Sequence, residues 1–347
     1  MNQLPQWNRE YTLSVLKTLL ETPSPTGYTE RLLQRLSAEA ETLGYRMDRL
    51  AKGGGLITVP GQTSGAALCL SAHVDTLGAM VRSVKDNGAL RFSLIGGYML
   101  QSIENEYCLI HTRNGRDIPG TILTTQPSVH VYPQARDLKR DEANYEIRLD
   151  EPVLSKEDVA ALGISTGDFI SFDPRPVFFQ NGYIKSRHLD DKAGVAVLFS
   201  VLEMLASAGI KPRRSLIFLF SNYEEVGHGA AFLPSGVEEM LAIDMGAIGE
   251  DLACTERDVS ICAKDSTGPY DWRMTTRLME LANRLGLKFA VDIYPRYGSD
   301  ASAALAGGHN IRAALIGPGV HASHAMERTH EDALRHTSAL AAAYALE

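Results

Sequence analysis

Five short segments of the sequence carry carboxylates or imidazoles in positions from which they could act together. The segments contain His73 with Asp75, Asp190 with Asp191, Glu224 with Glu225, Asp244, and His321 with His324. Imidazole and carboxylate ligands without thiolate suit borderline divalent cations such as zinc, cobalt and manganese. The sequence therefore offers the ligand types of a site for such cations.

The number of these groups fits two cations better than one. Two metal ions about 3.5–4 Å apart can act together in hydrolysis. Such a site needs a bridging carboxylate, further ligands on each ion, and a separate base for the attacking water. The adjacent residues Glu224 and Glu225 suggest a division of labour, because one can bind metal while the other stays free as a base.

Each segment also has an interpretation that involves no metal. A His-x-Asp sequence after a strand is often a hydrogen-bonded turn, and Asp190–Asp191 could cap the helix expected after them. The pair Glu224–Glu225 could be a solvated loop, Asp244 an ordinary turn residue, and 321–324 a surface loop. The occurrence of all five at the same edge of one sheet favours the metal site over five independent structural roles.

Alternating strands and helices would place these segments at one edge. Helical spacing of apolar residues predicts helices near 8–21, 29–43, 191–205, 271–285 and 331–346, and apolar runs predict strands near 55–59, 66–72, 215–221, 240–243 and 311–316. This alternation is typical of an α/β domain with a mostly parallel sheet covered by helices. Ligands bind such sheets beyond the carboxyl ends of the strands, where His73, Glu224 and Asp244 stand.

The middle of the chain has a different character. Between 85 and 178, short β-like runs near 91–95, 121–123, 129–132, 145–149 and 169–172 are separated by Gly and Pro turns. This pattern predicts a small β-rich barrel or sandwich. We therefore expect one catalytic α/β domain, formed by 1–84 and 179–347, that is interrupted by a β-rich domain at 85–178.

The composition describes a folded chain in a reducing compartment. The 347 residues are 44% hydrophobic and 22% charged, which excludes a disordered chain. Lys and Arg number 34 against 42 Asp and Glu, so no overall basic balance points to nucleic acid or anionic lipid. Four scattered cysteines, no evident signal peptide and no apolar run of about 18 residues predict a cytoplasmic protein without a membrane segment.

Several motifs, taken together and in order, resemble those of a known enzyme family. HVDTLGAMV, SRHLDDKAGVAVL, SNYEEVGHGA, AIDMG and YGSDASAA are similar to motifs of the dinuclear metallo-aminopeptidases, in the group that contains glutamyl aminopeptidase, deblocking aminopeptidases and the tetrahedral (TET) aminopeptidases. The resemblance covers essentially the whole chain. It implies a zinc-peptidase-like αβα sandwich, two divalent metal ions (zinc, cobalt or manganese) and a small peptide substrate. It also implies homo-oligomers built from dimers, up to a dodecamer, that assemble through the insertion.

The resemblance implies a role for each matching residue. His73 resembles a terminal ligand of one metal, and Asp75 resembles the acid that orients that histidine. Asp190 resembles the bridging carboxylate. The remaining carboxylates that match the family are Glu224 as the general base, Glu225 as a ligand of the second metal, Asp244 as the carboxylate on the first metal, and Asp300 near the substrate pocket, although a helix N-cap would explain Asp300 equally.

The last metal ligand is the least regular match. The family usually closes with a histidine in a His-Ser-Pro-x-Glu context, and here His324 lies three residues before Glu327 rather than four. We expect His324 to be this ligand, with His321 as the alternative. The sequence Gly-Pro-Gly at 317–319 should turn the chain, and His324 has more residues than His321 in which to return to the sheet edge.

The sequence therefore predicts a metallo-aminopeptidase that removes N-terminal residues from peptides, with Glu224 as its base. An aminoacylase or carboxypeptidase with a similar dinuclear sheet is an alternative, but its inserted domain is usually an α/β lid. A glycosidase would use two carboxyl groups about 5–10 Å apart. That mechanism would give the histidines no role. A non-catalytic oligomeric binding protein would not need the spare base Glu224.

Overall fold

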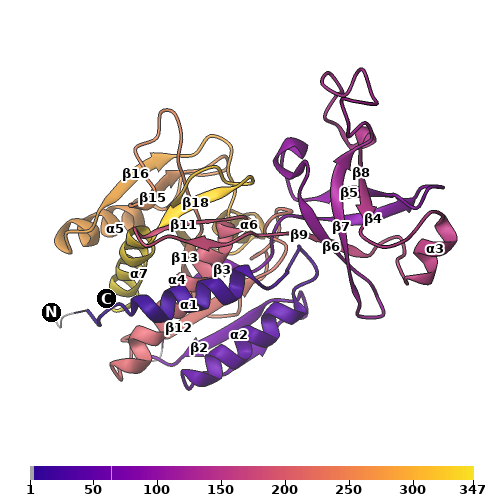
Figure 1. Cartoon of the computed structure of the whole chain (residues 1–347). Helices are drawn as coiled ribbons and strands as arrows, with labels where there is room; N and C mark the ends of the chain where they lie inside the picture. The colour runs from indigo at the N-terminus through magenta and orange to yellow at the C-terminus, as the bar shows by residue number, and fades with distance from the viewer. Residues whose placement is uncertain (1–3, 64) are drawn as a thin grey trace. The chain divides into compact units, whose positions relative to one another are not determined.

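The two apolar runs at 66–72 and 215–221 become neighbouring parallel strands within a nine-stranded sheet (Figure 1). The computed structural model describes residues 4–63 and 65–347. The order across the sheet is β1 (Met47–Arg49), β2 (Gly55–Val59), β12 (Leu216–Ser221), β3 (Ala67–His73), β13 (Val237–Ile243), β17 (Arg312–Val320), β15 (Val259–Lys264) and β16 (Phe289–Ile293), and β14 (Gly246–Ala247) pairs with β17. Because β12, β3, β13 and β17 run parallel, their carboxyl ends meet at one edge.

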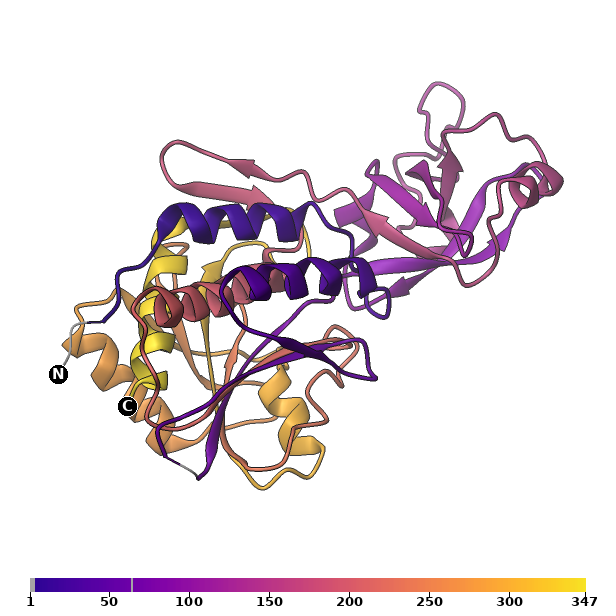
Figure 2. The same ribbon diagram turned by 90° about the horizontal axis from the view of Figure 1, so that it is seen from below.

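Side chains alternate between the two faces of this sheet, and both faces are covered. Leu68 and Leu70 of β3 enter the larger apolar core, whereas Cys69 enters a smaller core on the opposite face. The helices that pack into the larger core are α1 (Arg9–Leu20), α2 (Glu30–Thr42), α4 (Leu189–Ser207), α5 (Trp272–Arg284) and α7 (Glu331–Ala345). Helix α6 (Asp300–Ala306) packs on the other face (Figure 2). The predicted αβα sandwich is therefore confirmed.

A small antiparallel sheet connects two of the candidate segments. It consists of β10 (Val177–Phe178), β11 (Tyr183–Ser186) and β18 (Glu327–His330). Strand β11 precedes helix α4, and β18 follows β17 after a turn at 321–326. Because Ser186 pairs with Glu327, the start of α4 lies beside this turn.

Residues Thr76–Pro174 form a second unit, and the rest of the chain, up to Asp75 and from Arg175 onward, forms the first. The second unit is a closed antiparallel barrel rather than a sandwich. Its strands follow the order β4 (Gly78–Val84), β5 (Leu90–Ile95), β8 (Tyr145–Leu149), β7 (Asp117–Thr124), β6 (Tyr107–His111) and β9 (Phe169–Phe172), with the short helices η1 (Leu100–Ile103), η2 (Glu142–Asn144) and α3 (Lys156–Ala161) between them. Strand β4 lies before the expected boundary at residue 85.

One strand predicted in the insertion is absent. The run at 129–132 forms a turn, in which the backbone N–H groups of Val131 and Tyr132 donate to the carbonyl oxygen of Ser128 at 3.2 and 2.9 Å. Prolines flank the run on both sides and restrict its pairing. Val131 remains 68% exposed.

The turn predicted at 317–319 is also wrong, because β17 continues through these residues to Val320. A Cβ atom on Gly317 would lie 1.5 Å from the carbonyl oxygen of Asp244. The glycine therefore permits close approach of two chain segments rather than a change of direction. None of the helices within the described residues combines the length and the apolar character that a membrane crossing requires.

Candidate metal centre

Three of the candidate segments meet because their strands are neighbours. His73 is the last residue of β3, Glu224 and Glu225 follow β12, and Asp244 follows β13. Strand β3 lies between the other two, and its last residue pairs with the last residue of β12. The strand ends predicted from sequence therefore come together at one edge of the sheet.

Asp190 lies between two histidines. One oxygen, Oδ1, is 3.1 Å from Nε2 of His73, and the other, Oδ2, is 3.3 Å from Nε2 of His324. The hydroxyl of Ser323 also donates to Oδ2 at 3.0 Å. Burial alone would raise the pKa of Asp190, but the two histidines outweigh burial and lower it. This carboxylate is thus shared between the two imidazoles.

The turn after β17 separates the two candidate histidines. His321 is exposed and its backbone pairs with Arg328 in the hairpin. His324 has a positive φ of 64°, and its Nε2 lies 3.6 Å from Oε2 of Glu225. The buried carboxylate of Glu327 accepts from the backbone N–H of His324 at 3.0 Å and from that of Asp190 at 3.1 Å. Of the two histidines, the structure places His324 in the cluster.

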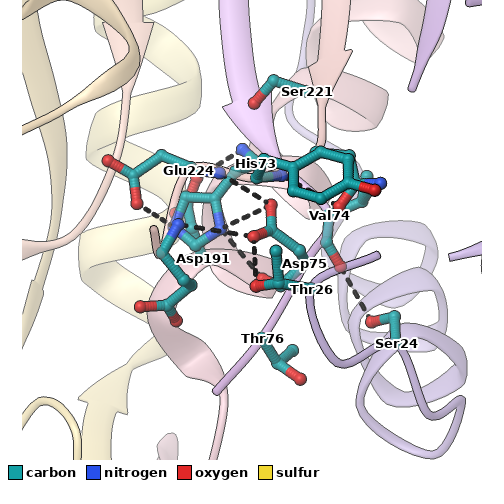
Figure 3. Close-up of polar contacts among 12 residues, drawn as sticks. Ser24, Thr26, His73, Val74, Asp75, Thr76, Asp191, Ser221 and Glu224 are labelled. Atoms are coloured by element: carbon teal, nitrogen blue, oxygen red, sulfur yellow. Dashed lines mark hydrogen bonds and ion pairs between the residues drawn. The ribbon is translucent and has the colours of Figure 1, made fainter. Parts of the chain in front are cut away.

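Glu224 and Asp75 lie on two sides of the His73 imidazole (Figure 3). Oε2 of Glu224 is 3.7 Å from Nε2 of His73. On the other side, Nδ1 is 2.9 Å from the carbonyl oxygen of Asp75 and 3.7 Å from its carboxylate. Asp75 therefore contacts the ring most closely through its backbone. Its carboxylate accepts instead from Thr26 and from the N–H groups of the two glutamates.

Asp191 and Asp300 have local structural partners. Oδ1 of Asp191 accepts from the N–H of Gly194 at 3.0 Å, as an N-cap would, and Oδ2 accepts from the N–H of His73 at 3.3 Å. The carboxylate of Asp300 accepts from the hydroxyl of Ser221 at 2.6 Å and from the N–H of Ala230 at 3.0 Å. These bonds hold the loop after β12, and they give Asp300 a positioning role beside the expected pocket.

The chemistry of these donors fits divalent cations. Ligand atoms of His73, Asp190 and Glu225 lie within 4.8 Å of one another, as do those of His73, Asp191 and Asp244. Oε1 of Glu225 is buried and makes no hydrogen bond to any of the described residues. A buried carboxylate oxygen without a partner is costly, and a cation would stabilise it.

Repulsion among the buried carboxylates also indicates that the cluster fits divalent cations. Burial raises the pKa of Glu224 and Glu225 well above the usual range, and neighbouring carboxylates raise it further. Burial and the charge of Asp190 raise the pKa of Asp244 to about 7. Burial lowers the pKa of His73, but its hydrogen bond to Asp190 and the nearby negative charges outweigh burial and raise it. The site concentrates negative charge that bound cations would neutralise.

The sequence did not predict the buried residues that support this cluster through hydrogen bonds. Thr26 and Asn222 are buried and bond to the segments around Asp75 and Glu224. Lys192 is also buried, and its Nζ donates to the carbonyl oxygens of Leu19 and Thr22 at 2.8 and 2.7 Å. One feature of the sequence near these supporting residues is unusual, the run TPSPTG at 22–27. By itself this run indicates no more than a break between two helices.

Comparison with known proteins identifies the family. The family model for M42 glutamyl aminopeptidases matches residues 53–340. The chain belongs to this family. YhfE of Bacillus subtilis (strain 168), whose name proposes aminopeptidase activity, is 47% identical over 330 residues and covers 95% of both chains. The M42 chain is therefore a peptide hydrolase of the aminopeptidase type, as the motifs predicted.

Solved structures share the fold of this M42 chain. An aminopeptidase from the archaeon Desulfurococcus kamchatkensis matches with a TM-score of 0.87 at 22% identity and covers 98% of this chain and 95% of its own. The TET1 peptidase of Pyrococcus horikoshii matches with a TM-score of 0.86 at 23% identity and covers 97% and 99%. That peptidase can assemble into a tetrahedron or a large octahedral shell.

Proposed function

We propose that this M42 aminopeptidase uses two divalent metal ions held on either side of Asp190. The observation that carries the proposal is the contact of each Asp190 oxygen with a different histidine, His73 at 3.1 Å and His324 at 3.3 Å. This carboxylate lies between two imidazoles, and all three side chains would take part in holding the cations. The buried oxygen of Glu225, which has no hydrogen-bond partner among the described residues, supports a cation on the His324 side.

The residues divide into two ligand sets around this bridge. Following the family resemblance, we assign His73, Asp190 and Asp244 to one ion and Asp190, Glu225 and His324 to the other. The converging donor groups, His73 with Asp190 and Glu225 and His73 with Asp191 and Asp244, supply most of these ligands. Asp191 is left out because it caps the start of helix α4. Zinc, cobalt and manganese suit this mixture of nitrogen and oxygen donors. Such ions, when bound, polarise the scissile carbonyl and lower the pKa of water.

Glu224 is the proposed general base. Its carboxylate is close to His73 but belongs to neither ligand set, and burial raises its pKa well above the usual carboxyl range. A carboxyl group whose pKa is raised in this way is suited to proton transfer. It accepts a proton from the attacking water and later donates a proton to the leaving amine. Asp75 orients the Glu224 backbone through its carboxylate and the His73 ring through its carbonyl oxygen.

A substrate panel tests this assignment against its rivals. Metal-depleted protein and protein restored with zinc, cobalt or manganese would be assayed on aminoacyl substrates, N-acylamino acids and a glucan. We expect metal-dependent cleavage of aminoacyl substrates alone. Cleavage of N-acylamino acids would favour an aminoacylase, metal-independent glucan hydrolysis a glycosidase, and the absence of any turnover a binding role.

We also propose that the chain forms a homo-oligomer and that the barrel unit contributes to it. The similar TET1 peptidase assembles into closed shells, and Met99, Val131 and Leu154 of the barrel unit are 68%, 68% and 85% exposed. Exposed apolar side chains mark an interface when they form one contiguous patch, which assembly would cover. Light scattering of the purified chain measures the assembly. A cytoplasmic location remains a prediction.

A further inference from the structure

The loop between α1 and α2 is unusually buried for a connection. Residues 22–27, with the sequence TPSPTG, are called the TPSPTG segment here. Its hydroxyl-bearing residues Thr22, Ser24 and Thr26 are only 5%, 1% and 4% exposed. Buried hydroxyls need hydrogen-bond partners, so the partners of this segment indicate what it does.

Two of these hydroxyls bond to the residues that follow strand β3. The Ser24 hydroxyl donates to the carbonyl oxygen of Val74 at 2.8 Å, and the Thr26 hydroxyl donates to Oδ2 of Asp75 at 2.7 Å (Figure 3). The third, on Thr22, donates within the end of helix α1, to the carbonyl oxygen of Thr18 at 2.7 Å. The segment therefore bonds directly to the chain beside His73.

The carboxylate of Asp75 connects this segment to the glutamate pair. Besides the Thr26 hydroxyl, it accepts from the N–H of Glu224 and the N–H of Glu225, each at 3.3 Å. The bond from Thr26 is much the shortest of the three. Because Asp75 is 0% exposed, bulk water is not available to replace a lost donor.

A second contact fixes the other end of the glutamate turn. Oδ1 of Asn222 accepts from the N–H of Gly27 at 3.2 Å and from the N–H of Tyr223 at 2.9 Å. The TPSPTG segment thus holds the turn through Asn222 on one side and through Asp75 on the other. Residues far apart in the sequence form one connected network behind Glu224.

We propose that Thr26 is a positioning residue of the reaction, acting through Asp75 on the backbone of Glu224 and Glu225. This inference rests on the proposed function. The Thr26 hydroxyl fixes the rotation of the Asp75 carboxylate, and that carboxylate fixes the two amides. The side chains of the base and of its metal-binding neighbour consequently leave the turn in the orientations that catalysis requires.

Three variants of the full-length, metal-loaded protein separate this role from general stability. Thr26→Val keeps the shape and removes the hydroxyl, Thr26→Ser keeps the hydroxyl, and Thr22→Val makes the same change at a buried hydroxyl that bonds within helix α1. We expect Thr26→Val to lower kcat on an aminoacyl substrate by about ten- to a hundredfold with KM changed less than about threefold. Thr26→Ser and Thr22→Val should stay within about threefold of the parent in both parameters.

Hydrogen exchange gives a second readout that does not depend on activity. In Thr26→Val, exchange at the amides of Glu224 and Glu225 should become faster while the bound metal per chain equals that of the parent. Thr26→Ser and Thr22→Val should leave these amides protected. Unchanged kcat in Thr26→Val would overturn the inference, as would unchanged exchange or an equal effect in Thr22→Val.

The same experiment distinguishes failure of the inference from failure of the proposed function. If the parent protein shows no aminopeptidase activity, the proposed function fails. In that case the exchange result still decides whether Thr26 holds the turn. If the parent is active and Thr26→Val keeps full kcat, the inference alone fails.

Discussion

Nε2 of His324 lies 3.3 Å from Oδ2 of Asp190. The histidine reaches this position from a turn outside the main sheet, with its backbone N–H donated to Glu327. His321, three residues earlier, pairs through its backbone with Arg328 and is exposed. Only one of the two histidines is therefore placed to complete the proposed second ligand set.

We expect His324→Ala to lose mainly the metal shared with Glu225 and to retain the other. His321→Ala should bind both ions as the parent does, because its imidazole is outside the cluster. Elemental analysis after dialysis against a limiting chelator measures ions per chain for both variants. One ion in His321→Ala with two in His324→Ala would reverse the assignment.

Replacement of Glu224 should separate catalysis from metal binding. Glu224→Gln keeps the size of the side chain and removes its capacity to accept a proton. We expect both metals to remain and turnover to fall by at least about a hundredfold, the usual scale for a general base. Loss of metal in parallel with turnover would instead place Glu224 among the ligands. Glu225→Gln is the matched comparison, and it should lose metal.

Asp190→Ala should reduce metal content more than His73→Ala does. If Asp190 bridges two ions as proposed, its loss would remove a ligand from both and leave two cations close together without a shared anion. Loss of His73, in the same proposal, would remove one neutral ligand from one ion. Isothermal titration of metal-free samples of both variants with zinc gives the comparison. Equal affinities in the two variants would argue against the bridge.

The sequence predicted the strand-end residues well because their positions depend on local patterns. His73, Glu224 and Asp244 each follow a buried apolar run, and parallel pairing of those runs is enough to bring them together. The αβα layers follow from the same alternation of apolar runs and helical periods. Each of these predictions depends on a sequence pattern that is only a few residues long.

Contacts between distant segments were not predictable in this way. The hydrogen bond from Thr26 to Asp75 joins residues 49 positions apart, and neither local sequence pattern predicts it. Gly317 suggested a turn because glycine often occurs in turns, yet it serves the close approach of Asp244. A single sequence does not distinguish a glycine required for close packing from a glycine required for a turn.

Metal removal should make the stability of the protein depend on pH. In the metal-free protein, burial and the charge of Asp190 raise the pKa of Asp244 to about 7 and that of Glu327 to about 8. The carboxyl groups of an unfolded chain have pKa values of about 4. Between these values the folded state holds protons that the unfolded state releases, so the free energy of unfolding falls as pH rises.

We therefore expect chelation to lower the Tm more at about pH 8 than at about pH 6. At the lower pH, protons neutralise part of the carboxylate cluster in place of the cations. At the higher pH, only bound metal relieves the repulsion, so its removal is more damaging. Thermal unfolding with and without chelator at both values measures the difference, and Asp190→Ala, which should already lack metal, is the control and should show no chelator effect. A larger chelator effect at the lower pH would contradict the assignment of these buried carboxylates to a cation site.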